Sequence, residues 1–202
     1  MTLVLIQTRC QELYSELEQI HKEINAFYDT IRPYERSGVN RELNNCPYSS
    51  YGYLMLCFSK IDLFSTYMSD GARGQTGRMV QYMLDYGITT DREVANVAVQ
   101  LWRHKLMHTS QPRKLEDSAT GTIYRWLSQW TEHELPRSKH LTFEVDGSEK
   151  ILQLCLTCLI EDVKSSFKKY EAALISPGAT ALQSNFLTVD NENTLPQNFE
   201  MR

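Results

Sequence analysis

The sequence lacks any long hydrophobic run. No stretch approaches the roughly 18 consecutive apolar residues that a membrane-spanning helix needs. The amino terminus also lacks the pattern of a secretory signal, because the short apolar run at residues 3–6 is soon followed by acidic residues. We therefore expect a cytoplasmic protein with no membrane partner.

Cysteine is scarce, with five residues among 202. Cys155 and Cys158 have C-x-x-C spacing, but no second pair follows at the distance that is typical of a zinc ribbon. On a helix, both sulfurs would lie on the apolar face. We therefore expect reduced thiols that pack in the core, and neither a metal site nor a redox centre.

The chain has no excess of positive charge, and its formal net charge is -4 at pH 7. This balance argues against a protein that coats nucleic acid through a broad basic surface. Residues 103–114 differ from the rest, since they include Arg103, Lys105, Arg113 and Lys114 and no acidic residue. Two interpretations stay open: a functional basic site, or a helix end, where cations are favoured.

Apolar residues at helical spacing dominate the sequence. Over residues 3–31 they recur every three or four positions, which predicts a long first helix that ends near Pro33. Residues 50–68 are apolar on most sides, as in the central helix of a bundle, so their charges should be paired or face a cleft. We expect Thr90 or Asp91 to cap a later helix, and a last long helix over 148–174.

Residues 121–146 have a different character. The segment 122–127 is rich in β-branched and aromatic residues, and 141–145 alternates apolar with polar, which predicts a small antiparallel pair of strands. The fold class is therefore predicted to be mainly all-α: an antiparallel helical bundle over residues 1–175 with a small β-hairpin-like insertion. Residues 176–202 are expected to be a polar tail that is flexible or orders on a partner.

Arg103 and His108 are the residues best suited to chemistry. Cleavage of RNA requires that the 2′-hydroxyl loses a proton, that the charge of the phosphorane is neutralised, and that the leaving oxygen gains a proton. Histidine suits the proton transfers because it titrates near neutral pH, and the planar guanidinium of arginine binds phosphate oxygens. This pair is chemically sufficient to cleave RNA without a metal.

The spacing of the pair has a consequence for assembly. Five residues along a helix turn the chain by about 500°, so the two side chains point roughly 140° apart. A second copy across a two-fold axis would bring the arginine of one chain near the histidine of the other. The chemistry therefore predicts a homodimer with one shared cleft.

The pattern Arg103-His104-x-x-x-His108, late in a helix, resembles the arginine-polar-histidine signature of HEPN domains. The resemblance covers about residues 1–175 and includes the long first helix, a second helix that contains Asp62, and a strand and long helix after the motif. It implies an all-α bundle that dimerises around the motif. Many HEPN domains are metal-independent endoribonucleases of toxin–antitoxin, phage-defence or RNA-processing systems.

Carried over by position, the resemblance makes Arg103 and His108 catalytic and His104 their polar assistant. Asp62 and Lys105 become supporting residues. The implied substrate is RNA, the implied protein partners are an antitoxin or a nucleotidyltransferase, and no cofactor or metal is implied.

Other interpretations of the motif stay open. Some HEPN domains are non-catalytic and bind a nucleotide or a second protein, and a plain structural bundle would place the same charges at a helix end. His104 and His108 also have the spacing of a helical metal pair, but no H-E-x-x-H motif and no evident third ligand accompany them.

Overall fold

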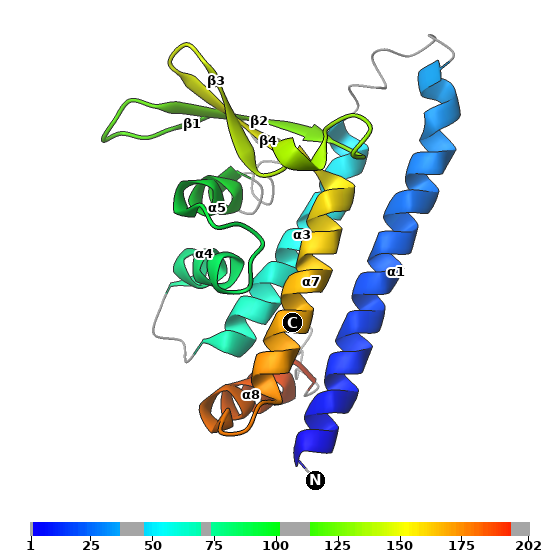
Figure 1. Cartoon of the computed structure of the whole chain (residues 1–202), viewed down its shortest axis with the longest axis vertical. Coiled ribbons are helices and arrows are strands. Elements are labelled where there is room, and N and C mark those ends of the chain that lie inside the picture. Colours follow the sequence, from blue (N-terminus) through cyan, green and yellow to red (C-terminus); the bar gives the residue numbers. More distant parts are fainter. Residues whose placement is uncertain (1, 37–46, 70–73, 102–113, 195–202) are drawn as a thin grey trace, which may run out of the picture.

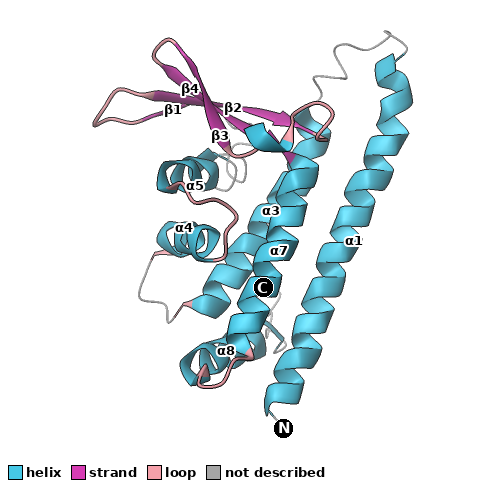
Figure 2. Ribbon diagram, viewed as in Figure 1, coloured by secondary structure: helices cyan, strands magenta, loops and turns pink. Residues whose placement is uncertain are grey.

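The structure, a computed structural model, describes residues 2–36, 47–69, 74–101 and 114–194. Helices and a mixed β-sheet share one hydrophobic core, and the sheet lies across one end of the long helices (Figures 1 and 2). Within the described ranges, no helix combines the length and the apolar character needed to cross a membrane.

Three long helices run along the length of the molecule: α1 (Thr2–Arg36), α3 (Pro47–Met68) and α7 (Leu156–Leu174). α1 lies on the outer side, next to α7 and α3 (Figure 1). The predicted apolar stripe of the first helix is confirmed over its middle part, where these members are buried: Ile6, Cys10, Leu13, Leu17, Ile20 and Ile24. Leu3, at the start of the stripe, is 43% exposed. The helix continues to Arg36, past the proline that was expected to end it.

Two shorter helices, α4 (Gln75–Asp85) and α5 (Arg92–Ala98), extend the core on the side of α3 away from α1 (Figure 1). The predicted cap of α5 is confirmed, since the Asp91 carboxylate accepts hydrogen bonds from the backbone N–H groups of Glu93 at 2.7 Å and Val94 at 3.2 Å. These bonds fix where the helix begins.

Within the described residues, the sheet contains four strands in the order β1-β2-β4-β3: β1 (Leu115–Glu116), β2 (Ile123–Gln129), β3 (Thr142–Asp146) and β4 (Glu149–Cys155). β4 pairs in parallel with β2 and antiparallel with β3. The predicted pairing of 122–127 with 141–145 is therefore wrong, because β4 lies between these two segments.

The prediction of a mainly all-α bundle with a hairpin-like insertion is also wrong. The mixed sheet makes this an α/β fold, in which β4 occupies residues that were assigned to the last helix. The reason lies in residues 151–156, which are apolar at every position except Gln153. Such a run suits a strand buried on both faces as well as it suits a buried helix.

Residues 180–194 form a further helix, α8 (Thr180–Thr194), at the end of the molecule opposite the sheet (Figure 1). Phe186 is fully buried, with its ring centroid 4.6 Å from that of Tyr67. Arg9 and Tyr67 both donate hydrogen bonds to Asp190, at 2.8 Å and 3.1 Å. The expectation of a flexible tail is therefore wrong for these residues.

Candidate functional site

The four motif residues Arg103, His104, Lys105 and His108 lie outside the described residues. The structure describes the chain up to Leu101, the residue two positions before the arginine, and its side chain is fully buried. The described chain therefore ends in the core two residues before the motif.

The helix that leads to the motif is attached at several places. Besides the Asp91 cap, α5 carries Glu93, whose carboxylate accepts hydrogen bonds from Tyr124 of β2 and from Lys150 of β4, both at 2.7 Å. The bond from Lys150, followed by that from Tyr124, lowers the pKa of Glu93 below its ordinary value. These contacts join α5 to the sheet.

Asp62 lies on α3 and faces α4. Its Oδ2 accepts a hydrogen bond of 2.5 Å from Nε2 of Gln75, the first residue of α4. The other charge on this helix, Lys60, is paired with Glu16 of α1. The prediction that charges on this apolar helix have partners is confirmed, and Asp62 links α3 to the start of α4.

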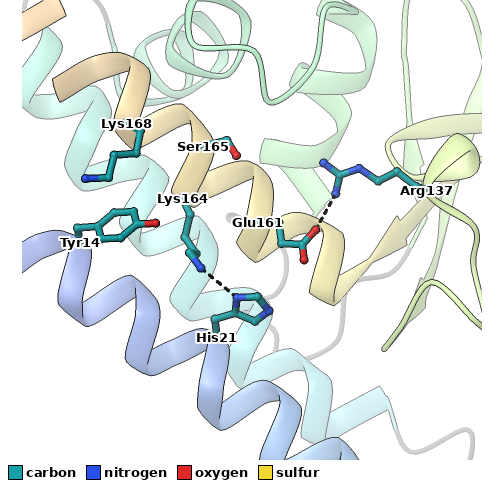
Figure 3. A pocket seen from close by; sticks show the side chains of 7 residues that line it. All are labelled: Tyr14, His21, Arg137, Glu161, Lys164, Ser165 and Lys168. Carbon is teal, nitrogen blue, oxygen red and sulfur yellow. Dashed lines mark hydrogen bonds and ion pairs between the residues drawn. The ribbon is translucent and has the colours of Figure 1, made fainter. Parts of the chain in front are cut away.

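A groove of about 520 Å³ lies between α1 and α7 (Figure 3). Three cations line it: Lys164 and Lys168 of α7, and Arg137 of the short helix η2 (Arg137–Lys139). The remaining lining side chains are Tyr14, His21, Glu161 and Ser165. We name this the α1–α7 groove.

Each cation of the α1–α7 groove is held in place by a neighbour. Lys164 Nζ lies 2.5 Å from Glu18 Oε1 and 3.2 Å from Nδ1 of His21. Lys168 Nζ lies 3.9 Å from the centroid of the Tyr14 ring, where it makes a cation–π contact. These contacts orient the ammonium groups within the groove.

Arg137 is held by two hydrogen bonds to α7. Its Nη1 donates a hydrogen bond of 3.0 Å to the carbonyl oxygen of Cys158, and its Nη2 bonds the Asp162 carboxylate. Glu161, on the rim, lies 3.7 Å from the same guanidinium. These contacts hold the planar guanidinium group of Arg137 in one orientation.

His21 is held in its neutral form. Burial and then the positive charge of Lys164 lower the pKa of His21 below its ordinary value of 6.5, against the opposite effects of Glu161 and Glu18. Because an ammonium group only donates, Nδ1 of His21 accepts the hydrogen bond from Lys164. The ring proton of the neutral form is then on Nε2.

We predict that His21 makes the stability of the protein depend on pH. Its folded-state pKa is lowered, so its contribution is complete above pH 6.5 and is lost as the pH falls through the folded pKa. Between about pH 7 and pH 5, the free energy of unfolding should fall more steeply for the wild type than for His21→Gln. Urea denaturation at a series of pH values measures this difference, and equal slopes would contradict the prediction.

A buried polar cluster lies behind Arg137. His140 Nδ1 accepts a hydrogen bond of 3.0 Å from the backbone N–H of Cys155, and its Nε2 lies 3.2 Å from Oδ2 of Asp162. The His140 side chain is only 3% exposed. These contacts join the end of β4 to the first turns of α7, so they support Arg137 from the protein interior.

The cysteines of the described residues are buried, free thiols: Cys10, Cys57, Cys155 and Cys158. The core-packing prediction is confirmed for these four, whereas Cys46 lies outside the described residues. Cys155 ends β4 instead of lying on the predicted helix. Burial, together with a hydrogen bond to Cys155, raises the pKa of Cys158 to about 12, which keeps this thiol protonated at neutral pH.

The residues of the α1–α7 groove could not be recognised as one site from the sequence. His21 falls on the polar face of the first helix and looks like an ordinary solvated side chain. The available signal was the spacing of Lys164 and Lys168, which places two cations on one face of a helix. Nothing in the local sequence connects them with Arg137.

Comparison with family models, curated proteins and solved structures finds no match to this chain. The functional proposals therefore depend on the residues of the chain itself.

Proposed function

We propose that this chain is a metal-independent endoribonuclease of the HEPN type that acts as a homodimer. The observation that carries the proposal is the spacing of Arg103-His104-x-x-x-His108, which begins two residues after buried Leu101. The attachment of α5 to β2 and β4 supports it, because a catalytic pair requires a fixed starting point in the scaffold.

Each motif residue has a defined role in this proposal. Arg103 binds the scissile phosphate and neutralises the charge that develops on the phosphorane. His108 removes the proton of the 2′-hydroxyl and returns a proton to the leaving 5′-oxygen. The bond from the 2′-oxygen to phosphorus forms as the bond to the 5′-oxygen breaks, which gives a 2′,3′-cyclic phosphate and a 5′-hydroxyl end.

The supporting residues act around this pair. His104 and Lys105 add polar and positive groups next to the phosphate. Asp62 keeps the supporting role that the resemblance gives it, while its hydrogen bond to Gln75 joins α3 to α4. A protein of this kind works in the cytoplasm, with an antitoxin or a nucleotidyltransferase as its protein partner.

The proposal is tested by incubating the purified chain with single-stranded RNA in the presence of a chelator. We expect RNA to be cut and the matching 2′-O-methyl RNA to stay intact, because methylation removes the attacking hydroxyl. Loss of cleavage in chelator, or equal cleavage of both substrates, would refute the mechanism. Intact RNA that nevertheless binds to the chain would favour the non-catalytic binding module instead.

A further inference from the structure

The C-x-x-C pair of Cys155 and Cys158 lies at the junction between a strand and a helix. Cys155 is the last residue of β4 and the N-cap of α7, and Cys158 lies in the first turn of that helix. The expectation that this pair is not a redox centre assumed that both residues lie on one helix. The structure removes that assumption, because a C-x-x-C pair between a strand and the N-terminus of a helix is a typical arrangement of redox-active dithiols.

The two thiols are close enough to form a disulfide. The N-cap and the third residue of a helix are separated by roughly 5 to 6 Å between their Cα atoms, which is within the range that a disulfide spans. The side chains of Cys155 and Cys158 also make a hydrogen bond with each other. A bond between the two sulfurs therefore requires rotation of the side chains and no new path of the backbone.

Neither helix capping nor the main core explains why two cysteines lie at this junction. The Cys155 side chain makes no capping hydrogen bond, which Ser, Thr, Asp or Asn would supply at this position. Cys155, Cys158 and Leu135 form a small buried cluster that is separate from the main core. Leu135 belongs to the connection between β2 and β3, so a loop covers the pair on one side. Local opening of a loop costs less free energy than opening of a packed core, which gives a small reagent access to the thiols.

Arg137 lies next to the pair and favours a thiolate there. Burial and the hydrogen bond to Cys155 raise the pKa of Cys158 to about 12, while the Arg137 guanidinium opposes this rise through a hydrogen bond and its positive charge. Cys158 therefore keeps its proton at neutral pH, so the first attack on a reagent falls to Cys155 and the second to Cys158. The partial positive charge at the N-terminus of α7 also stabilises negative charge that develops on these sulfurs.

We propose that Cys155 and Cys158 form a reversible disulfide by exchange with a low-molecular-weight disulfide such as oxidised glutathione. The Cys155 thiolate attacks one sulfur of the reagent and displaces the first glutathione. The Cys158 thiolate then attacks the Cys155 sulfur and displaces the second glutathione. The two protein thiols are oxidised to one disulfide, the reagent is reduced to two thiols, and the two protein protons end on these thiols. The exchange uses no residue of the Arg103–His108 motif and does not depend on the proposed nuclease activity.

The test incubates the folded full chain, as a Cys46→Ser variant, with an excess of oxidised glutathione. Free thiols are then blocked with N-ethylmaleimide in denaturant, and the chain is digested with trypsin. Cleavage after Lys150 and Lys164 releases one peptide that contains Cys155, Cys158 and no other cysteine. We expect this peptide to lose the mass of two hydrogen atoms and to take up no maleimide, and we expect dithiothreitol to restore both thiols.

Cys10 and Cys57 are the matched controls within the same molecule. Both are buried free thiols of the main core, and neither has another cysteine three residues away. A single buried thiol has no resolving partner, so we expect both to react at least about tenfold more slowly than the Cys155–Cys158 pair.

Two single variants separate the steps of the exchange. Cys158→Ser should stop at a mixed disulfide with glutathione on Cys155, whereas Cys155→Ser should leave Cys158 reduced. The proposal is overturned if the 151–164 peptide with both cysteines keeps its two thiols, or if Cys10 and Cys57 react as fast as this pair. These two outcomes are measured on the intact pair, so they do not depend on how the single variants fold.

Discussion

Replacing His108 with alanine is expected to lower the rate of RNA cleavage by roughly 100-fold to 10,000-fold, the range that general acid–base catalysis by one side chain supplies. The reason is that the 2′-hydroxyl loses its base and the leaving 5′-oxygen loses its acid in the same substitution. Initial rates with a fluorescent RNA at saturating concentration, in chelator, measure the effect. His108→Ala should leave the thermal stability of the fold unchanged if the imidazole works on substrate.

The matched control is His133→Ala. His133 is exposed and lies in the connection between β2 and β3, so its removal takes away an imidazole without touching the motif. We expect this variant to cleave at the wild-type rate. If the His108→Ala protein cleaves RNA as fast as the His133→Ala protein, His108 is not a catalytic residue.

Phe186→Ala is expected to lower the free energy of unfolding by about 3 to 5 kcal/mol, the usual cost of deleting a buried aromatic ring. The ring is fully buried, lies against Tyr67 of α3, and joins α8 to the core at the end opposite the sheet. The substitution leaves a cavity between two helices. Urea denaturation followed by circular dichroism measures the change.

Ser184→Ala is the matched control for this prediction, because Ser184 is exposed on the same helix. Its effect should stay within about 0.5 kcal/mol. If residues 180–194 were a flexible tail, the two substitutions would have equally small effects, which is the outcome that contradicts the packing of α8.

The helices that carry the core could be predicted from the sequence because their signals are local. The apolar spacing of residues 3–31 and the Asp91 cap depend only on neighbours within one or two turns. The sheet could not be predicted in the same way. β4 pairs with β2, which lies more than twenty residues away, and its apolar run satisfies helical and strand spacing equally.

The C-terminal helix was missed for a related reason. Residues 180–194 are polar on average, and a composition of this kind indicates a flexible tail. A single fully buried aromatic residue, Phe186, and the bonds from Arg9 and Tyr67 to Asp190 are enough to dock the helix. These contacts join residues more than 100 positions apart, which local patterns do not report.

The two candidate sites differ in the same respect. The Arg103–His108 motif is contiguous, so its spacing could be recognised directly in the sequence. The α1–α7 groove takes its residues from α1, η2 and α7, and only the folded chain brings Arg137 into the same groove as Lys164. The second site could not be recognised in the sequence because its residues lie far apart along the chain, and not because their chemistry is unusual.

The central claim is that an arginine of one chain and a histidine of its partner act on the same phosphate. Its most direct test unfolds Arg103→Ala and His108→Ala proteins together, refolds them as a mixture, and measures RNA cleavage in chelator. Half of the resulting dimers should contain one chain of each variant, and each of these pairs restores one complete arginine–histidine combination. We predict that the mixture recovers about a quarter of the wild-type activity, whereas each variant alone is inactive. A mixture that cleaves no faster than the separate variants would contradict a cleft shared between the two chains.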